Sequence, residues 1–384
     1  MNNNYKEIAY IHDFCFYKNK KGTCYTAVGM PEKYFDRFFE SGFEQVKIYS
    51  RSKVKNEKFI QDIGFNKIKN KSILIPLMLK NYAHLLSPRV IRSLIIEFKR
   101  ADLLVINFPS IIGLYSWILN LISKTPYTLE VAADADQFSQ KKFGGIVTRI
   151  FKWIFPRIVN SSQGGIYVSK YLLEQFPHPN GTVASNVIVN SIKPLETKNY
   201  LKYTHDSKKY KILFVGGVNK RKGVSTLIEA MEILVSKGYD NISLDIVGGH
   251  NDLDYKSIVK SKGLGDKIFF RGILSASELR HYFESANLYV QPSFAEGIPR
   301  ATLEAMSYNI PILATRLPGF REVLEEICLF DSGDSNSLSL LIESVLNCEH
   351  NIMRTVEINN KKISEYTVDK LHSKRIEFYR GLNV

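Results

Sequence analysis

Glu296 and Glu304 are the two residues of this sequence whose type and spacing most directly suggest chemistry. A short apolar stretch at residues 288–290 predicts a buried strand ahead of them. Pro299 predicts the start of a helix, because a proline costs least in the first helical turn. Glu296 is therefore expected in the loop between the strand and the helix, and Glu304 about two turns into the helix. An apolar strand at residues 312–315 is expected to follow.

A loop carboxylate beside a helix N-terminus suggests a site for a ligand that carries both an anion and hydroxyl groups. The exposed amides and the partial positive charge of the helix end favour phosphate. Glycoside hydrolysis also uses two carboxylates, but such pairs face each other roughly 5 to 9.5 Å apart. Eight residues, partly at about 1.5 Å of rise each, separate these two by more than that. We interpret them as hydroxyl binders at two places on one ligand, the plainer alternative being two solvated charges.

A second anion site is predicted where an apolar strand at residues 210–215 runs into Gly216 and Gly217. A basic loop with Arg221 and Lys222 follows, and then an amphipathic helix at residues 224–236. A strand, a glycine turn, a basic loop and a helix N-terminus together can hold a diphosphate. A tight turn with a solvated basic loop is the alternative.

The stretch from Glu296 to Glu304, Glu-Gly-Ile-Pro-Arg-Ala-Thr-Leu-Glu, is the Glu-x7-Glu signature and resembles the retaining glycosyltransferase family 4, which has the GT-B fold. A Pro-Ile-Leu-Ala-Thr strand and a Pro-Gly-Phe-Arg-Glu segment follow in the family's order. The resemblance is close in the second half of the chain and covers the first half in outline. It implies that Glu296 contacts the donor sugar, that Glu304 holds the ribose, and that Lys222 binds the diphosphate of a nucleotide sugar.

The resemblance also indicates the wider donor site and one departure from the family. Gly217 stands where the family usually has Arg, so Arg221 or Lys220 is expected to supply a second charge, unless Lys222 and the backbone amides suffice. The backbone near Ile273 is expected to contact the nucleotide base. The expected donor-binding residues are Gly216, Gly217, Arg221, Lys222, Ile273, Glu296, Gly297, Ile298, Pro299, Arg300 and Glu304. No metal or other cofactor is expected, because fixed cations and helix amides replace a metal in this family.

The first half of the chain predicts a Rossmann-like unit. A strand at residues 7–12, a lysine-bearing loop at 13–22, a helix at 31–42 and a strand at 45–49 give its β-loop-α-β opening. Gly22 and Thr23 loosely resemble the family's first-loop glycine region, a solvated lysine loop being the alternative.

The acceptor side is less well marked. A strand at residues 127–132 is followed by Asp134 and Asp136, an Asp-x-Asp pattern that binds Mg²⁺ or Mn²⁺ in another glycosyltransferase fold. Because the second half favours GT-B, a metal is not expected here. Many family members carry a His in this region where this chain has Ala132 or Ala133. Glu130, Asp134 and Asp136 are therefore the acceptor-side candidates, and Asp134 is grouped with Glu296 and Lys222 as catalytic.

Nearly all of the formal net charge of +14 lies in residues 1–200. Basic and apolar or aromatic residues alternate at 73–100 and 141–159, which favours contact with an anionic membrane, a core helix with a charged outer face being the alternative. No nucleic-acid-binding motif accompanies the charge, so no nucleic-acid partner is expected. The N-terminus does not resemble a signal peptide, and the apolar stretch 103–123 is broken by Asn107, Pro109 and Gly113 into a strand and a helix. Four cysteines without a CxxC pair favour a reducing compartment.

We therefore expect an α/β protein of the GT-B fold, with two Rossmann-like domains facing a central cleft. Residues 1–195 and the final helix at 366–384 would hold the acceptor, residues 205–365 would bind the donor, and a lysine-rich linker at 193–209 would join them. The expected reaction is metal-independent hexosyl transfer from a UDP- or GDP-sugar to a glycan linked to polyprenyl diphosphate, on the cytoplasmic face of the inner membrane. The lysine- and asparagine-rich composition and segments 131–138 and 144–149 resemble bacterial capsule and lipopolysaccharide enzymes. A nucleotide-sugar epimerase of this fold and an inert nucleotide-sugar-binding module are the alternatives.

Overall fold

The computed structural model describes residues 7–26, 30–56, 59, 66–76, 78–79, 81–132, 145–186, 192, 210–249, 253–297, 300–347 and 350–382. The chain divides into two compact units, the first made of Met1–Asn186 with His372–Val384 and the second of Val187–Leu371. The expected linker at 193–209 lies outside the described residues, as do Asp134, Asp136, Ile298 and Pro299.

The first unit is built on a largely parallel sheet. Its main strands lie in the order β10 (Gly181–Val183), β9 (Gly165–Tyr167), β8 (Tyr127–Val131), β7 (Leu103–Phe108), β1 (Glu7–Lys18) and β3 (Gln45–Val54). Short strands extend it, namely β2 (Cys24–Thr26), β4 (Asn66–Lys67), β5 (Ile73–Leu74) and β6 (Met78–Leu79). The parallel strand β3 pairs on one side of β1, whereas β7 pairs on the other side. The order of the strands therefore reverses at β1, which is where open α/β sheets bind ligands.

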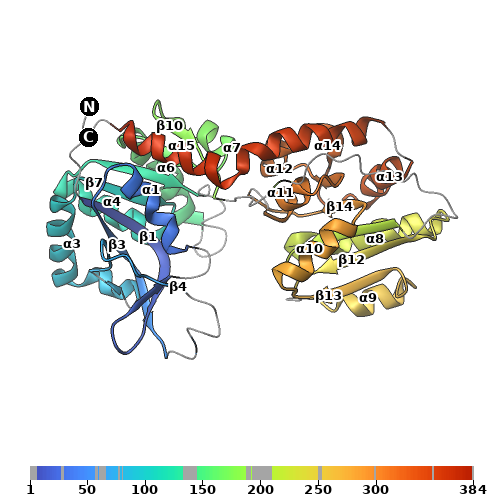
Figure 1. The fold of residues 1–384 in the computed structure, drawn as a ribbon, viewed down its shortest axis with the longest axis horizontal. Helices are drawn as coiled ribbons and strands as arrows, with labels where there is room; N and C mark the ends of the chain where they lie inside the picture. Colours follow the sequence, from blue (N-terminus) through green and yellow to red (C-terminus); the bar gives the residue numbers. More distant parts are fainter. Residues whose placement is uncertain are drawn as a thin grey trace. The chain divides into compact units, whose positions relative to one another are not determined.

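The helices of the first unit cover both faces of this sheet (Figure 1). Their bounds are η1 (Glu32–Phe35), α1 (Asp36–Glu40), η2 (Tyr82–Leu86), α3 (Pro88–Arg100), α4 (Ile111–Ser123), α6 (Gly145–Asn160), α7 (Lys170–Gln175) and α15 (Val368–Arg380). One core joins alternate residues of β1, β7 and β8 to α3, α4 and α6. On the opposite face Tyr10 and Glu130 contact the side chains of α1 and α15. Local sequence sets the helix starts: Pro88 opens α3, and the Ser110 hydroxyl accepts from the Gly113 amide at the start of α4.

The expected loop at residues 13–22 was wrong in its first part. β1 continues as a strand to Lys18, with a register shift relative to β3 between Ile11 and Cys15, and then turns into the antiparallel strand β2. Gly22 and Thr23 lie in that turn, where the Asn19 side chain accepts from the Thr23 amide at 2.8 Å. Residues 13–18 form a strand because β2 and β3 supply hydrogen-bonding partners for them. The periodicity of a single sequence does not reveal such distant partners.

The apolar stretch 103–123 is a strand followed by a helix, as expected, with β7 and α4 joined through a cis Phe108–Pro109 peptide bond. In the part of the chain that the structure describes, no helix is both long and apolar enough to span a bilayer.

The second unit is a doubly wound parallel sheet with the strand order β13 (Ile268–Gly272), β12 (Ile242–Val247), β11 (Tyr210–Val215), β14 (Leu288–Gln291), β15 (Ile312–Thr315) and β16 (Leu329–Phe330). Its helices surround these strands (Figure 1). They are η3 (Lys220–Lys222), α8 (Val224–Ser236), α9 (Tyr255–Ser261), α10 (Ala276–Ser285), α11 (Arg300–Ser307), α12 (Pro318–Val323), η4 (Glu326–Cys328), α13 (Ser335–Leu346), α14 (His350–Ile363) and η5 (Ser364–Tyr366). The sequence analysis did not foresee α12 and α14. One core packs α8, α9 and α13 on one face of the sheet, and another packs α10, α11 and α12 on the other.

Candidate functional site

The strand order of the second sheet reverses between β11 and β14, and this places two predicted loops side by side. β12 follows β11 in the chain and pairs on one side of it, whereas β14 pairs on the other side. The loop after β11 carries Arg221 and Lys222, and the loop after β14 carries Glu296. The Phe294 amide donates to the Arg221 carbonyl oxygen at 2.8 Å, which ties the two loops together at the carboxyl ends of their strands.

A close backbone approach at Gly223 holds the basic loop in place. Asn219 caps η3 by accepting from the Lys222 amide at 3.1 Å, and Gly223 closes it with a φ of 68°. A Cβ on Gly223 would lie 1.7 Å from the Pro292 carbonyl oxygen. Only glycine fits both the left-handed conformation and this contact. The path of the chain at Gly223 therefore sets where Lys222 lies relative to the loop after β14.

Lys222 and Glu296 form an ion pair, and both side chains are largely buried. The guanidinium of Arg221 lies 3.7 Å from the Glu296 carboxylate and donates to the Ala295 carbonyl oxygen at 2.7 Å. The Ser293 hydroxyl donates to the same carboxylate at 3.1 Å. Two cations and one carboxylate thus meet at the switch point. Of the two candidates for a second charge, Arg221 lies beside the Glu296 carboxylate.

Ser293 is a part of this site that the sequence analysis missed. Its carbonyl oxygen accepts from the hydroxyls of Thr315 at 2.6 Å and Ser332 at 3.2 Å, and its hydroxyl accepts from the side-chain amide of Gln291 at 3.0 Å. These contacts anchor the Glu296 loop to β14, β15 and the turn before α13. Pro292 and Ser293 directly follow β14, and a polar residue at the end of a buried strand was the available signal.

Glu304 lies half-buried on α11, and burial raises the pKa of its carboxyl above the ordinary range while Arg300 opposes the shift. Burial also raises the pKa of Tyr289 strongly, and the negative charges of Glu296 and Glu304 add to that effect. Both glutamates are therefore within electrostatic reach of one buried tyrosine ring. No described residue hydrogen-bonds to the Glu304 carboxylate, which leaves it able to accept from a ligand.

The remaining expected donor residues that the structure describes lie at the same edge of the sheet. A Cβ on Gly248 would meet the Gly216 carbonyl oxygen at 1.8 Å, so the loops after β11 and β12 touch through their glycines. Ile273, at the end of β13, is 85% exposed, and its side chain lies against Gly249. An exposed apolar side chain beside glycine backbone can stack on a flat ring. Gly297, which follows Glu296, and Arg300, the first residue of α11, are exposed.

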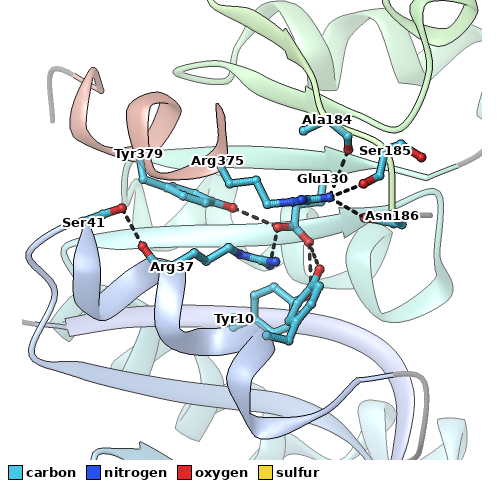
Figure 2. A network of polar contacts seen from close by, with 10 residues as sticks. Tyr10, Arg37, Ser41, Glu130, Ala184, Ser185, Asn186, Arg375 and Tyr379 are labelled. Carbon is cyan, nitrogen blue, oxygen red and sulfur yellow. Dashed lines mark hydrogen bonds and ion pairs between the residues drawn. The ribbon is translucent and has the colours of Figure 1, made fainter. Parts of the chain in front are cut away.

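Glu130 lies elsewhere, at the centre of a buried network in the first unit (Figure 2). Its carboxylate pairs with Arg37 at 2.6 Å. Three tyrosine hydroxyls donate to it, those of Tyr10 at 3.0 Å, Tyr34 at 2.9 Å and Tyr379 at 2.9 Å. Burial alone would raise the pKa of this carboxyl, but Arg37, Arg375 and the tyrosines outweigh it and hold the pKa below the ordinary range. This arrangement supports a structural role for Glu130, in place of the acceptor-side role that the sequence suggested.

Arg375 completes the attachment of α15 to the first unit. Its guanidinium donates to the carbonyl oxygens of Ala184 at 3.2 Å and Ser185 at 2.6 Å, as Figure 2 shows. Among the described residues no group of three His, Cys, Asp or Glu side chains is placed to hold a metal ion.

Comparison with known proteins agrees with this geometry. Residues 197–364 match the family described as Glycosyl transferases group 1. Protein CapJ of Staphylococcus aureus is 28% identical over 379 residues, covering 96% of this chain and 94% of CapJ. The capsular polysaccharide biosynthesis glycosyltransferase CapM of S. aureus is 26% identical over 174 residues, 44% of each chain.

Solved structures show the same fold over nearly the whole length. Anabaena Alr3699/HepE in complex with UDP and glucose superposes with a TM-score of 0.63 at 15% identity, covering 96% of this chain and 98% of that one. The lipopolysaccharide outer core galactosyltransferase WaaB superposes with a TM-score of 0.66 at 16% identity, covering 97% and 98%. The two doubly wound sheets and these solved structures together show that this chain has the GT-B fold, and over residues 197–364 it resembles the Glycosyl transferases group 1 family, which relates it to bacterial enzymes of surface-polysaccharide synthesis such as CapM.

Proposed function

We propose that this protein transfers a hexose, with retention of configuration and without a metal, from a UDP- or GDP-sugar to a glycan acceptor in the synthesis of a bacterial capsule or related exopolysaccharide. The observation that carries the proposal is the meeting of Lys222, Arg221 and Glu296 at the switch point of the second sheet. The relative CapM is named for capsular polysaccharide biosynthesis, and the HepE structure contains UDP and glucose.

Binding of the donor would break the ion pair between Lys222 and Glu296. A diphosphate that binds Lys222 and Arg221 releases the Glu296 carboxylate, which can then accept from a sugar hydroxyl. Glu304 accepts from the ribose hydroxyls, and Ile273 packs on the base. Fixed cations act most strongly where negative charge develops, which is the diphosphate as its bond to the sugar breaks.

The transfer itself needs no basic side chain on the enzyme. The bond from the anomeric carbon to the diphosphate oxygen breaks while the acceptor oxygen bonds to the same face of that carbon. The departing phosphate oxygen takes the acceptor's hydroxyl proton. This chemistry suits a chain that has alanine where relatives carry a histidine.

We also propose that the acceptor is a glycan linked to polyprenyl diphosphate, and that the first unit binds the cytoplasmic face of the inner membrane. Helix α6 exposes Lys152 and Trp153, the latter 64% exposed, and Arg157 lies 3.7 Å over the Trp153 ring. Three exposed apolar residues of α4, Ile118, Leu121 and Ile122, share one helix face. Helix α3 exposes the cations Arg89, Arg92, Lys99 and Arg100. Exposed apolar groups with flanking cations are the chemistry that an anionic membrane surface binds.

Thermal-shift screening of UDP, GDP, TDP and AMP tests the donor assignment. A ligand at 100 times its dissociation constant stabilises the native state by about 2.7 kcal/mol. We expect UDP or GDP to raise the melting temperature of the wild-type chain and to lose that effect in Lys222→Met. Lys256→Met, which removes an exposed lysine of α9, is the matched control and should behave like the wild type.

Turnover assays separate the alternatives. Sugar transfer that requires an acceptor supports the proposal. Interconversion of the nucleotide sugar without an acceptor would identify an epimerase, and nucleotide binding without any turnover would identify an inert binding module.

A further inference from the structure

The first sheet has its own switch point, and a histidine stands at it. β1 lies between β3 and β7, and its pairing with both runs up to Ile11, opposite Tyr49 and Ile106. The register with β3 then shifts before Cys15, so the bulge begins at His12. Bulges occur next to functional sites because they redirect a side chain. His12 therefore lies just past the point where β1 stops pairing with β7, ahead of the extension of β1 to Lys18, at the place where this class of sheet binds ligands.

The bulge itself fixes the imidazole of His12. The Phe14 amide donates to Nδ1 at 2.9 Å, and the ring stacks on Tyr10 with centroids 5.8 Å apart and planes inclined by 17°. The Phe14 ring packs against the imidazole in an edge-to-face arrangement, with centroids 5.6 Å apart. Because Nδ1 accepts a hydrogen bond, the proton of the neutral ring resides on Nε2. Within the described part of the chain, nothing accepts from that N–H.

The surroundings of His12 keep the ring neutral. Burial lowers the pKa of His12 to about 4, with the Glu130 carboxylate of β8 opposing the shift and the guanidinium groups of Arg37 on α1 and Arg51 on β3 adding to it. A ring that is neutral at physiological pH, with Nδ1 occupied, can donate through Nε2 but cannot take a proton there.

We infer that His12 is an acceptor-binding residue of the first unit, whose Nε2–H donates a hydrogen bond to a hydroxyl or ring oxygen of the acceptor glycan. The inference rests on the proposed function. It follows from the position at the switch point, the fixed ring and an Nε2–H from which no described residue accepts. The half-buried rings of His12 and Phe14 offer apolar surface beside a single donor, the combination that small polar ligands bind. His12 orients the acceptor and does not deprotonate it.

Steady-state kinetics of His12→Phe, His12→Gln and His281→Phe test this role. The assay uses the nucleotide sugar found by thermal shift, with octyl glycosides and diphosphate-linked glycosides as acceptors. His12→Phe keeps an aromatic ring on Tyr10 but lacks the donor, and should raise KM for the acceptor roughly tenfold. Its KM for the donor should stay within about twofold of the wild type. His12→Gln retains an N–H and should recover part of the loss, whereas His281→Phe, an exposed change on α10, should have no effect.

The outcomes separate this inference from the proposed function. An unchanged acceptor KM in His12→Phe, with transfer intact in the wild type, overturns the role of His12 alone. Absence of transfer by the wild type to every glycoside overturns the proposed function and the inference with it. Nitrogen-15 NMR of the histidine rings gives an independent readout: we expect an Nε2–H tautomer for His12 that titrates near pH 4. An Nδ1–H tautomer, or titration near 6.5, contradicts the proposed geometry.

Discussion

At the scale of single residues, the candidate donor site holds two cations beside one carboxylate, whose opposite charges partly neutralise one another. Glu296 accepts from Ser293 and pairs with Lys222, and Arg221 lies 3.7 Å from it. Removing one partner of such a set leaves the others to reorganise. The two glutamates of the signature are therefore expected to respond differently to substitution, because only Glu296 shares its charge with the cations.

Glu296→Ala should abolish transfer while preserving nucleotide binding. Lys222 and Arg221 lose their internal partner, so UDP or GDP should bind at least as tightly as to the wild type, whereas transfer should fall by about 10² or more. Isothermal titration and a transfer assay measure the two effects. Glu229→Ala, an exposed change on α8, is the control. Normal transfer in Glu296→Ala would show that the site is assigned wrongly.

Glu304 should make nucleotide affinity depend on pH. The raised pKa of its half-buried carboxyl means that it protonates at a higher pH than an ordinary glutamate. In the proposed contact the carboxylate form accepts from two ribose hydroxyls, whereas the protonated form loses one of these acceptors, so affinity should fall as the pH is lowered through the raised pKa of Glu304. The diphosphate also takes up a proton as the pH falls. This affects wild type and Glu304→Gln alike, so the ratio of their affinities reports the titration of Glu304 alone. We expect wild type and Glu304→Gln to differ by about tenfold near pH 7.5 and to converge at acid pH. A constant ratio would exclude a ribose contact through the ionised carboxyl.

At the scale of elements, positions of close approach decide where the loops lie. Gly223 has a positive φ and faces the Pro292 carbonyl group. Gly263 has nearly the same φ, but a Cβ added there would meet no atom within 4 Å. Alanine substitutions at these two glycines therefore separate the free-energy cost of a left-handed backbone from the cost of a steric clash between two loops.

Gly263→Ala should destabilise the protein by roughly 1 kcal/mol, the cost of a left-handed alanine. Gly223→Ala adds a collision that the backbone must relieve by moving, and should cost several kcal/mol and remove the thermal shift produced by the nucleotide. Differential scanning calorimetry with and without nucleotide measures both. Equal effects of the two substitutions would show that the contact with Pro292 does not position the basic loop.

The attachment of α15 depends on the network around Glu130. Glu130→Gln leaves the buried Arg37 without its counter-ion, and should destabilise the first unit by about 3 to 5 kcal/mol. Tyr379→Phe removes one hydrogen bond and should cost about 1 kcal/mol. The folded protein holds the pKa of Glu130 below its usual value. The contribution of Glu130 to the free energy of unfolding is therefore complete above about pH 4.5 and is lost as the pH falls through the folded-state pKa. Hydrogen exchange of the α15 amides measures these changes, and unchanged protection in Glu130→Gln would contradict the role of the network.

At the scale of the whole molecule, the basic character of the first half should appear as membrane binding. The wild-type chain should sediment with vesicles that contain phosphatidylglycerol and much less with phosphatidylcholine alone, and salt should weaken the binding. Replacing Trp153 and Lys152 together by Ala and Gln should reduce it by about tenfold, whereas Lys237→Gln, at the residue that follows α8 in the second unit, should not. Equal binding to both kinds of vesicle would count against an electrostatic contact.

Local patterns in the amino-acid sequence, with the family resemblance that they carry, were enough to predict the class of fold and to name candidate residues for the donor site. Strand and helix periodicity, the glycines after β11 and the spacing from Glu296 to Glu304 are short-range features, so they can be recognised without knowing what lies nearby. Arg221 and Lys222 were named from the same kind of pattern. The pattern did not indicate which of these side chains would touch one another.

Contacts between distant parts of the chain could be seen only in the folded molecule. Folding paired Lys222 with Glu296 across two loops, continued β1 past His12, and enclosed Glu130 between Arg37 and Tyr379. These outcomes depend on burial and on partners far away in the sequence, and local propensity records neither.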